Sequence, residues 1–183
     1  MEFNVKFRAL QSGDEIFINS LRDLSERESK VGGMKRYVSI DRERKWVNDL
    51  IMSDNQSVIY LAVTPIDSDE IIGYISISDI DYRSGTCFWS GIKLHPDCGG
   101  KGYGLQVALL VLKYVFEELR MVRCIGVCQE NHLAMLKLML KVGMSKEGLM
   151  RKSLFKNGRH INQWLVSITD DDYRESLKPK YDI

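Results

Sequence analysis

The stretch from residue 86 to residue 119 constrains the fold of this chain more than any other part. A strand-like run, TCFWSGIKL, ends at Leu94 and is followed by four glycines within residues 99–104. From Leu105 onward the apolar residues recur at helical spacing, with polar residues on the opposite side. A strand that turns through glycines into an amphipathic helix indicates an α/β fold, and such turns often hold phosphates.

The flanking patterns alternate between strand and helix periodicity. Strands are predicted at 4–10, 57–64, 71–80, 86–94, 122–129, 146–156 and 160–168, and helices at about 14–28, 41–53, 105–119 and 131–141. Asn131 opens the last helix, Gly143 ends it, and Asn157 with Gly158 predicts a tight hairpin. We therefore expect an α/β (α+β) fold, with one mixed sheet of about seven strands and four helices on its faces.

Composition excludes several classes of protein. The chain has 26 Lys and Arg against 25 Asp and Glu, so it lacks the basic surplus typical of a nucleic-acid binder. No apolar run approaches the roughly 18 residues that cross a bilayer, and residues 1–10 contain no signal-peptide core. We expect a cytoplasmic protein with no nucleic-acid or membrane partner. Residues 1–183 are expected to form a single domain, with a core from about 4 to 175.

The cysteines do not indicate a disulfide scaffold or a metal site. Four cysteines are too few for such a scaffold in a chain of 183 residues. Cys124 and Cys128 are four residues apart on a predicted strand, which separates them by about 13 Å, too far for two ligands of one zinc ion. The three histidines are scattered along the chain. We therefore expect buried thiols and no metal.

The glycine loop has the chemistry of an anion site. Amides at a helix N-terminus point outward, glycines let a phosphate approach the backbone, and Lys101 adds a positive charge. Two common phosphate motifs do not fit, because Lys101 is followed by Gly102 rather than Ser or Thr, and the sixth position from Gly100 is Leu105. Taken alone, the spacing fits a ligand-free turn equally well.

The run GIKLHPDCGGKGYG resembles motif A of the GNAT (Gcn5-related) N-acetyltransferases, whose pattern is Arg/Gln-x-x-Gly-x-Gly/Ala at the same strand-to-helix junction. Gly102 and Gly104 fill its two small positions, and Asn131 opens the helix after the next strand. VGMSKEG resembles a later family motif, and a strand pair around FKNGRHI follows it. With the opening VKFRAL, this last run is similar to the branch of ribosomal-protein alanine N-acetyltransferases and related small-amine acetyltransferases.

The resemblance implies that acetyl-CoA donates its acetyl group to a primary amine by direct attack in a ternary complex. The family splays its fourth and fifth strands, so the pantetheine arm would enter there while the loop amides hold the pyrophosphate. A backbone amide near Ile92 would polarise the thioester carbonyl. The residues so implied for acetyl-CoA are Ile92, Lys93, Leu94, Gly99, Gly100, Lys101, Gly102, Tyr103, Gly104 and Asn131.

Three positions depart from the family pattern. Gly99 stands where the family has Arg or Gln, and Trp89 stands where many relatives have a glutamate base. Leu138 or Met139 stands where many have a tyrosine acid. The catalytic residues are therefore unknown from sequence. The polar residues predicted near the relevant strand ends, each equally well explained as a turn or surface residue, are Asp79, Asp81, Ser90 and Glu130.

The resemblance places the acceptor between residues 25–40 and the last hairpin. Trp89, Ser90 and Tyr37 are candidate pocket residues, with core packing equally open for Trp89. A polyamine would require an acidic cluster, and the segment offers only Glu26 and Glu28. A protein N-terminus, an amino sugar and a small-molecule amine all stay open as acceptors, and a homodimer is compatible with the sequence.

Two further functions stay open. Because the glutamate and tyrosine are replaced and Gly99 removes a phosphate contact, the chain could be a CoA-binding regulatory module with little or no turnover. A structural domain whose glycine loop binds nothing is the third possibility. Cys87 and Cys98 could act as acyl carriers only if the reaction were not a direct attack.

Overall fold

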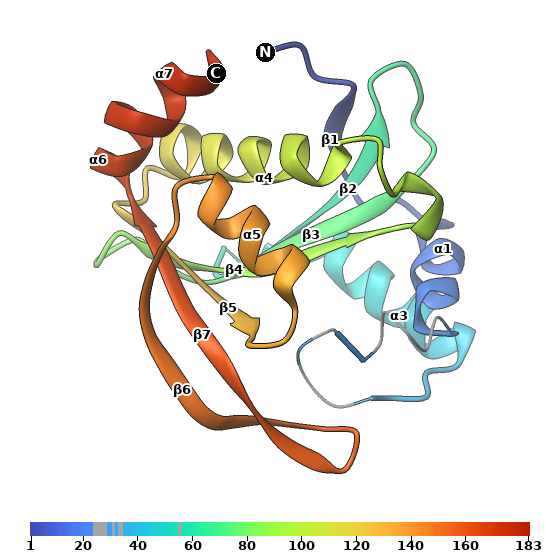
Figure 1. Cartoon of the computed structure of the whole chain (residues 1–183). Coiled ribbons are helices and arrows are strands. Elements are labelled where there is room, and N and C mark those ends of the chain that lie inside the picture. The colour runs from blue at the N-terminus through green and yellow to red at the C-terminus, as the bar shows by residue number, and fades with distance from the viewer. Residues whose placement is uncertain (24–28, 31, 33–34, 55) are drawn as a thin grey trace.

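The computed structural model describes residues 1–23, 29–30, 32, 35–54 and 56–183. The strands are β1 (Val5–Ala9), β2 (Ile59–Pro65), β3 (Gly73–Asp81), β4 (Thr86–Leu94), β5 (Arg123–Gln129), β6 (Ser145–Lys156) and β7 (Arg159–Thr169). The helices are α1 (Asp14–Ser20), α3 (Ile40–Ile51), α4 (Tyr103–Lys113), α5 (Leu133–Lys141), α6 (Asp170–Asp172) and α7 (Lys178–Tyr181) (Figure 1). Glu26, Glu28 and part of the 25–40 segment lie outside the described residues.

The strands form one seven-stranded sheet in the order β1-β2-β3-β4-β5-β7-β6, which confirms the predicted mixed sheet. The first four strands make an antiparallel meander, and β4 then runs parallel to β5. The parallel register covers only three pairs and ends where Phe88 meets Ile125. Beyond that pair β4 stays bonded to β3 and β5 to β7, so the two central strands separate as the resemblance implied.

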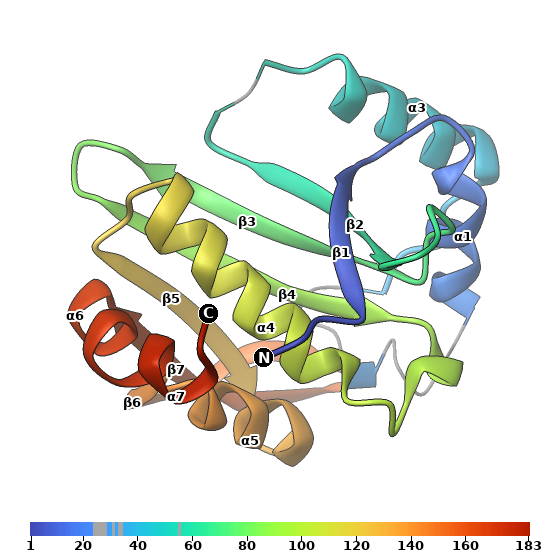
Figure 2. The same cartoon turned by 90° about the horizontal axis from the view of Figure 1, so that it is seen from above.

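Helices cover the two faces of the sheet unequally. On one face α4 and α5 pack over the central strands, and the C-terminal helical segment lies beside them (Figures 1 and 2). On the other face α1 and α3 enclose a smaller core over the first strands, around Val47 and Ala62. Each large apolar side chain buried in these layers contributes about 1.5–3 kcal/mol. Within the described residues, no helix is long and apolar enough to cross a membrane.

The helix ends differ from the prediction in physically clear ways. The first helix was predicted to reach about residue 28, but it ends at Ser20 and tightens into a 3₁₀ turn at Leu21–Asp23. The rest of the predicted range, 24–28, lies outside the described residues. The helix after β5 begins at Leu133, because the ring of His132 accepts a hydrogen bond from the Met135 amide at 3.5 Å. His132 therefore caps this helix and Asn131 precedes the cap.

Local turn signals gave correct predictions. Asn157 and Gly158 both have positive φ, 50° and 77°, which is the conformation of a two-residue hairpin turn between β6 and β7. Gly143 has a φ of 86° just past the end of α5, as a helix-terminating glycine should. In Figure 1 the β6–β7 hairpin extends well beyond the other strands.

The chain after β7 forms a helical segment that the sequence did not predict. Thr169 caps α6 in a capping box with Asp172, and a π-helical turn then leads to α7. Tyr173 is buried and donates a hydrogen bond to Glu117 at 2.9 Å, and Lys178 reaches the same carboxylate at 2.5 Å. Leu177 is also buried, so the packed core continues past residue 175.

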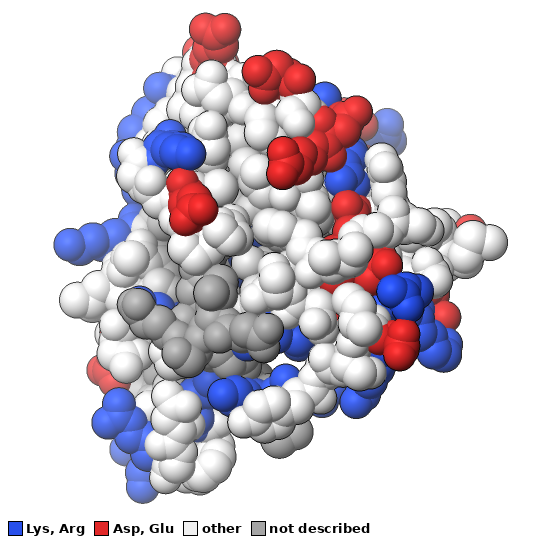
Figure 3. All heavy atoms as spheres, turned by 90° about the vertical axis from the view of Figure 1, so that its right-hand side faces the viewer, with Lys and Arg blue, Asp and Glu red and all other residues white. Residues whose placement is uncertain are grey.

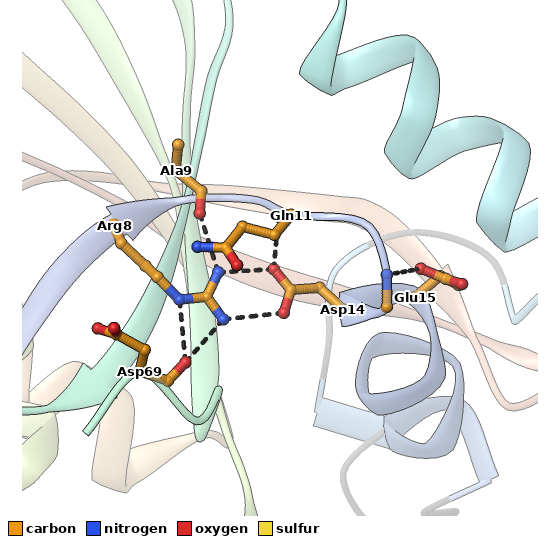
Figure 4. A network of polar contacts seen from close by, with 7 residues as sticks. Arg8, Ala9, Gln11, Asp14, Glu15 and Asp69 are labelled. Carbon is orange, nitrogen blue, oxygen red and sulfur yellow. Dashed lines mark hydrogen bonds and ion pairs between the residues drawn. The ribbon is translucent and has the colours of Figure 1, made fainter.

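An ion pair fixes α1 to the first strand (Figure 4). Arg8 on β1 donates to both carboxylate oxygens of Asp14, at 2.8 and 2.9 Å, and to the carbonyl of Asp69 at 2.9 and 3.0 Å. The Asp14 carboxylate also accepts from the Gln11 amide at 2.8 Å. The hydrogen bond to Asp14 raises the pKa of Arg8. This contact joins β1, α1 and the β2–β3 turn, and so positions the helix that precedes the 25–40 segment.

Candidate active site

The site begins at a bulge in β4, next to the point where β4 leaves β5. Ser76 pairs with Gly91 and Ile77 pairs with Trp89, so Ser90 is the extra residue. Gly91 has a φ of 122°, a conformation that other residues rarely adopt. The bulge changes the direction of the β4 backbone at the point where the gap between β4 and β5 begins.

Beyond the bulge, no strand among the described residues pairs with the β5 side of β4. Ile92, Lys93 and Leu94 pair with β3 on one side, while the parallel register with β5 has already ended. A strand edge of this kind offers alternating amides and carbonyls to an extended ligand. The side chain of Lys93 turns to the Tyr74 hydroxyl, 2.7 Å away.

The glycine loop forms an open backbone cradle at the start of α4. Gly100 and Gly102 each have a φ of 75°, and Gly102 is the N-cap of the helix. A Cβ added at either position would meet nothing within 4 Å, so the space over both glycines is free. Because the first amides of a helix have no acceptor within the helix, they point into this space. Unpaired amides at the start of a helix are the kind of group that binds an anion such as phosphate.

The structure also explains the unusual Gly99. His95 caps a 3₁₀ turn at Pro96–Cys98, with its ring nitrogen 3.4 Å from the Asp97 amide. A Cβ at Gly99 would lie 3.1 Å from the Pro96 carbonyl, closer than an ordinary contact. A side chain at residue 99 would therefore push against this turn, and the exposed Lys101 is the cation beside the loop.

A cavity of about 190 Å³ opens between the end of β5, the start of α5 and the tip of the β6–β7 hairpin. Figure 3 shows this side of the molecule, with several basic side chains in the lower part of the view. Asn131 lies in the wall of this cavity. The described lining is Ser29, Lys30, Gln129, Asn131, His132, Lys156, Asn157, Arg159 and Ile161.

Two titratable groups beside the cavity are held in their neutral forms. Burial, together with the charge of Lys30, lowers the pKa of His132, which suits its role as a hydrogen-bond acceptor at the helix cap. Burial raises the pKa of the Cys128 thiol to about 11, so it is protonated near neutral pH. Neither group is therefore a charged reactant at pH 7.

The three candidate pocket residues occupy very different places. Trp89 is 1% exposed and packs in the core on the α4 side, so it forms no open wall, and core packing is the role that its position supports. Tyr37 is 88% exposed, with Lys35 over its ring, and is not part of the described cavity lining. Ser90 is exposed at the bulge. Of the three, only Ser90 borders the gap between the central strands.

The four polar residues predicted near the strand ends also differ from one another in their contacts. Asp81 accepts from the amides of Arg83 and Ser84, which stabilise its own turn. A hydrogen bond from the Ser84 side chain, together with these amides, lowers the pKa of Asp81. Glu130 accepts from the Asn162 amide group at 2.9 Å. Asp79 and Ser90 are different, because both contact a residue that sequence reasoning missed. That residue is Ser78, and its signal in the sequence is the polar alternation in ISIS at 75–78.

The cysteines have structural positions. Cys87 is 2% exposed and pairs directly with Cys124 across the parallel strands, and the hydrogen bond between these buried thiols raises the pKa of Cys124. Cys98 is half-buried in the turn before the glycine loop. Among the residues that the structure describes, no group of three or more His, Cys, Asp or Glu side chains could hold a metal ion.

Comparisons with known proteins agree with this geometry. The chain is 27% identical over 171 residues to the SPβ prophage-derived uncharacterized N-acetyltransferase YokL of Bacillus subtilis, covering 93% of this chain and 92% of that protein. It is 27% identical over 107 residues to the uncharacterized N-acetyltransferase YnaD of the same organism, covering 58% and 62% of the two chains.

Among solved structures, the fold is similar to a spermidine N-acetyltransferase from Vibrio cholerae in complex with CoA and spermine. The TM-score is 0.85 at 22% identity, over 93% of this chain and 98% of that one. Residues 4–145 match the family described as acetyltransferase (GNAT) domain. The chain therefore belongs to the GNAT acetyltransferase family.

Proposed function

We propose that this protein transfers the acetyl group of acetyl-CoA to a primary amine at the gap between β4 and β5. The observation that carries the proposal is the end of the parallel register at Phe88 and Ile125, beside an open glycine cradle. In a GNAT chain, this combination supplies both a slot for an extended arm and an anion site at its end.

The residues present fit acetyl-CoA, which would supply an activated acetyl thioester. The amides from Gly99 to Gly104 and the cation of Lys101 suit the pyrophosphate. The open edge at Ile92 and Leu94 suits the amide groups of the pantetheine arm. Asn131 would hydrogen-bond the same arm from across the gap, since it lies between β5 and α5. The β4 amides beside the bulge would polarise the thioester carbonyl.

The cavity by the hairpin tip is the proposed entry for the acceptor. Its described lining is polar and includes the basic side chains Lys30, Lys156 and Arg159. We propose a single primary amine on a polar small molecule or at a peptide N-terminus. The resemblance to the ribosomal-protein alanine branch supports a peptide. A polyamine would require carboxylates, and the described lining contains none.

The alternative function is acetyl-CoA binding without turnover. It is supported by the positions of Leu138 and Met139, neither of which can donate a proton to a leaving thiolate. Met139 is 1% exposed in the core, and the Leu138 side chain lies 3.8 Å from where a Gly104 Cβ would be. In the proposed enzyme, the thiolate therefore takes its proton from solvent.

A panel of amines decides between the two functions. Release of free thiol from acetyl-CoA is measured with amino sugars, amino acids, peptides with free N-termini, and spermidine. The proposal predicts amine-dependent release with at least one polar monoamine or peptide, and little with spermidine. Binding of acetyl-CoA, followed by thermal shift, without release across the whole panel would favour the binding module.

A further inference from the structure

We propose that Ser90, Ser78 and Asp79 form a proton relay that removes the proton from the acceptor amine during acetyl transfer. The inference rests on the proposed function and adds to it a base that the family pattern does not supply at Trp89. Ser90 is the member that would touch the acceptor, while Ser78 and Asp79 act through it.

The hydrogen bonds fix the direction of the relay. The hydroxyl of Ser78 donates to the Asp79 carboxylate at 3.0 Å. The hydroxyl of Ser90 lies 2.9 Å from that of Ser78. An ionised carboxylate can only accept, and Ser78 has one proton to donate, so Ser90 must be the donor to Ser78. The lone pairs of Ser90 are then directed away from Ser78 and can accept a proton from an incoming amine.

The relay begins where the reacting groups would meet. Ser90 is two residues beyond Phe88, the last β4 residue in the parallel register with β5. Its chain neighbour Trp89 points into the core on the α4 side, and the contact with Ser78 places the Ser90 hydroxyl on the opposite face. Ser90 is exposed there, and so is Asp79 at the far end of the relay. A proton can therefore enter at the gap and leave to solvent.

Backbone irregularities bring the three groups together. In a regular strand, neighbouring side chains such as those of Ser78 and Asp79 point to opposite faces. Asp79 instead has a φ of 49°, and the β3–β4 register shifts between Ser78 and Asp81. This left-handed residue turns the carboxylate back to the Ser78 side. Such a conformation in a non-glycine residue costs about 1–3 kcal/mol and is found preferentially at functional sites.

The other carboxylates near these strand ends are already engaged. Asp81 accepts two amide hydrogen bonds within its own turn, and Glu130 accepts from Asn162. The pKa of Asp81 is held low by its hydrogen bonds, which makes it a weak base. Of the four candidates from the sequence, Asp79 is thus the carboxylate joined to the exposed Ser90.

The proton and bond changes balance. The acceptor nitrogen forms a bond to the acetyl carbon while the bond from that carbon to sulfur breaks. One proton passes from nitrogen to Ser90, the Ser90 proton passes to Ser78, and the Ser78 proton passes to Asp79. Asp79 then releases this proton to water, and the departing thiolate takes one from water, so the net change is amine plus thioester to amide plus thiol.

The test uses Asp79→Asn, Ser78→Ala and Ser78→Thr, with Asp81→Asn as the matched control. Asn tolerates positive φ and keeps an acceptor oxygen, so Asp79→Asn removes the base with little change in backbone. Asp81→Asn removes an equal charge nearby and can keep its turn. We expect a fall in kcat on the order of 100-fold for Asp79→Asn, with little change in the KM for acetyl-CoA.

Three readouts separate a relay from a structural role. Ser78→Ala should lower kcat by a similar factor, the double variant should lose no more than either single one, and Ser78→Thr should restore most of the activity. The loss should shrink as the pH rises, because hydroxide can then remove the proton from the attacking nitrogen in place of the relay. The proton inventory, measured in mixtures of light and heavy water, should be curved in the unsubstituted chain and linear in Asp79→Asn.

Two results would overturn the relay while leaving acetyl transfer intact. One is an Asp79→Asn variant that retains the kcat of Asp81→Asn. The other is a pair of losses at Ser78 and Asp79 that multiply in the double variant. Absence of amine-dependent turnover in the unsubstituted chain would overturn the proposed function together with the relay.

Discussion

Phe88 of β4 pairs with Ile125 of β5, and this pair is the last in the parallel register between the two central strands. The next residues of β4 form the bulge at Ser90, and the open edge continues to Leu94. The glycine cradle and α4 follow directly. In the proposed function, one short stretch of chain would thus contribute the polarising amides, the slot for the arm and the anion site, in the order in which they follow one another along the chain.

Gly102→Val should abolish acetyl-CoA binding. The φ of 75° strains a β-branched residue, and the new side chain would fill the open space over the loop. We expect the affinity, measured by titration calorimetry, to fall by about 100-fold or more, or about 2.7 kcal/mol. Gly158→Val is the control, since its φ is 77° and its surroundings are equally open. If Gly102→Val and the unsubstituted chain bind acetyl-CoA with equal affinity, the proposed position of the pyrophosphate at this loop is wrong.

Asp14→Ala should destabilise the fold. It leaves the Arg8 guanidinium, 14% exposed, without its bidentate partner and loosens α1 from β1. We expect a loss of about 3 kcal/mol in the free energy of unfolding, measured with urea. Asp49→Ala, which removes the exposed pair with Lys45, should lose less than about 0.5 kcal/mol. Similar losses in both variants would mean that the Arg8 contact is no stronger than a surface pair.

Cys98→Ser should keep the turnover of the unsubstituted chain. Direct attack by the amine requires no acyl-cysteine, and Cys87, the other candidate carrier, is buried on the α4 side of the sheet. Intact-protein mass spectrometry after mixing with acetyl-CoA alone should show no acetylated protein. An acetyl adduct that Cys98→Ser abolishes, together with its activity, would instead establish a covalent route.

Acid should release the C-terminal segment through Glu117. The Lys178 ammonium and then the Tyr173 hydroxyl lower the pKa of this carboxyl. Its contribution to stability is therefore complete above the ordinary glutamate pKa of about 4.3 and is lost as the pH falls through the lower folded value. Glu117→Gln should weaken the dependence of the free energy of unfolding on pH in this range. Glu118 is adjacent and exposed, so Glu118→Gln should leave that dependence unchanged. Identical pH profiles in all three chains would contradict this linkage.

The sequence predicted the parts of the fold that depend on local signals. Asn157 and Gly158 fix the hairpin, and Gly143 ends α5, because only residues that tolerate positive φ fit those positions. The glycine loop was predicted from the sequence for the same reason, because its glycines also mark positions that tolerate positive φ. The C-terminal helix was missed because its anchors are few. Tyr173 and Leu177 are its buried residues, and the partner of Tyr173, Glu117, is distant in sequence.

The candidate site was predicted less completely, and β4 shows why. One extra residue at Ser90 changes which face each later position occupies, and only the Ser90–Gly91 pair marks it in the sequence. Trp89 was compared with a family glutamate, yet its side chain points into the core. The contact from Ser78 to Ser90 joins two strands, and its geometry depends on the register shift, which no local pattern encodes.

The most direct measurement follows both products of one reaction, the free thiol and the N-acetylated amine, with the best acceptor from the panel. We expect equal molar amounts of the two from the unsubstituted chain, and neither from Gly102→Val. Thiol released without acetylated amine, or acetyl-CoA bound by the chain and never consumed with any amine, would contradict acetyl transfer at this site.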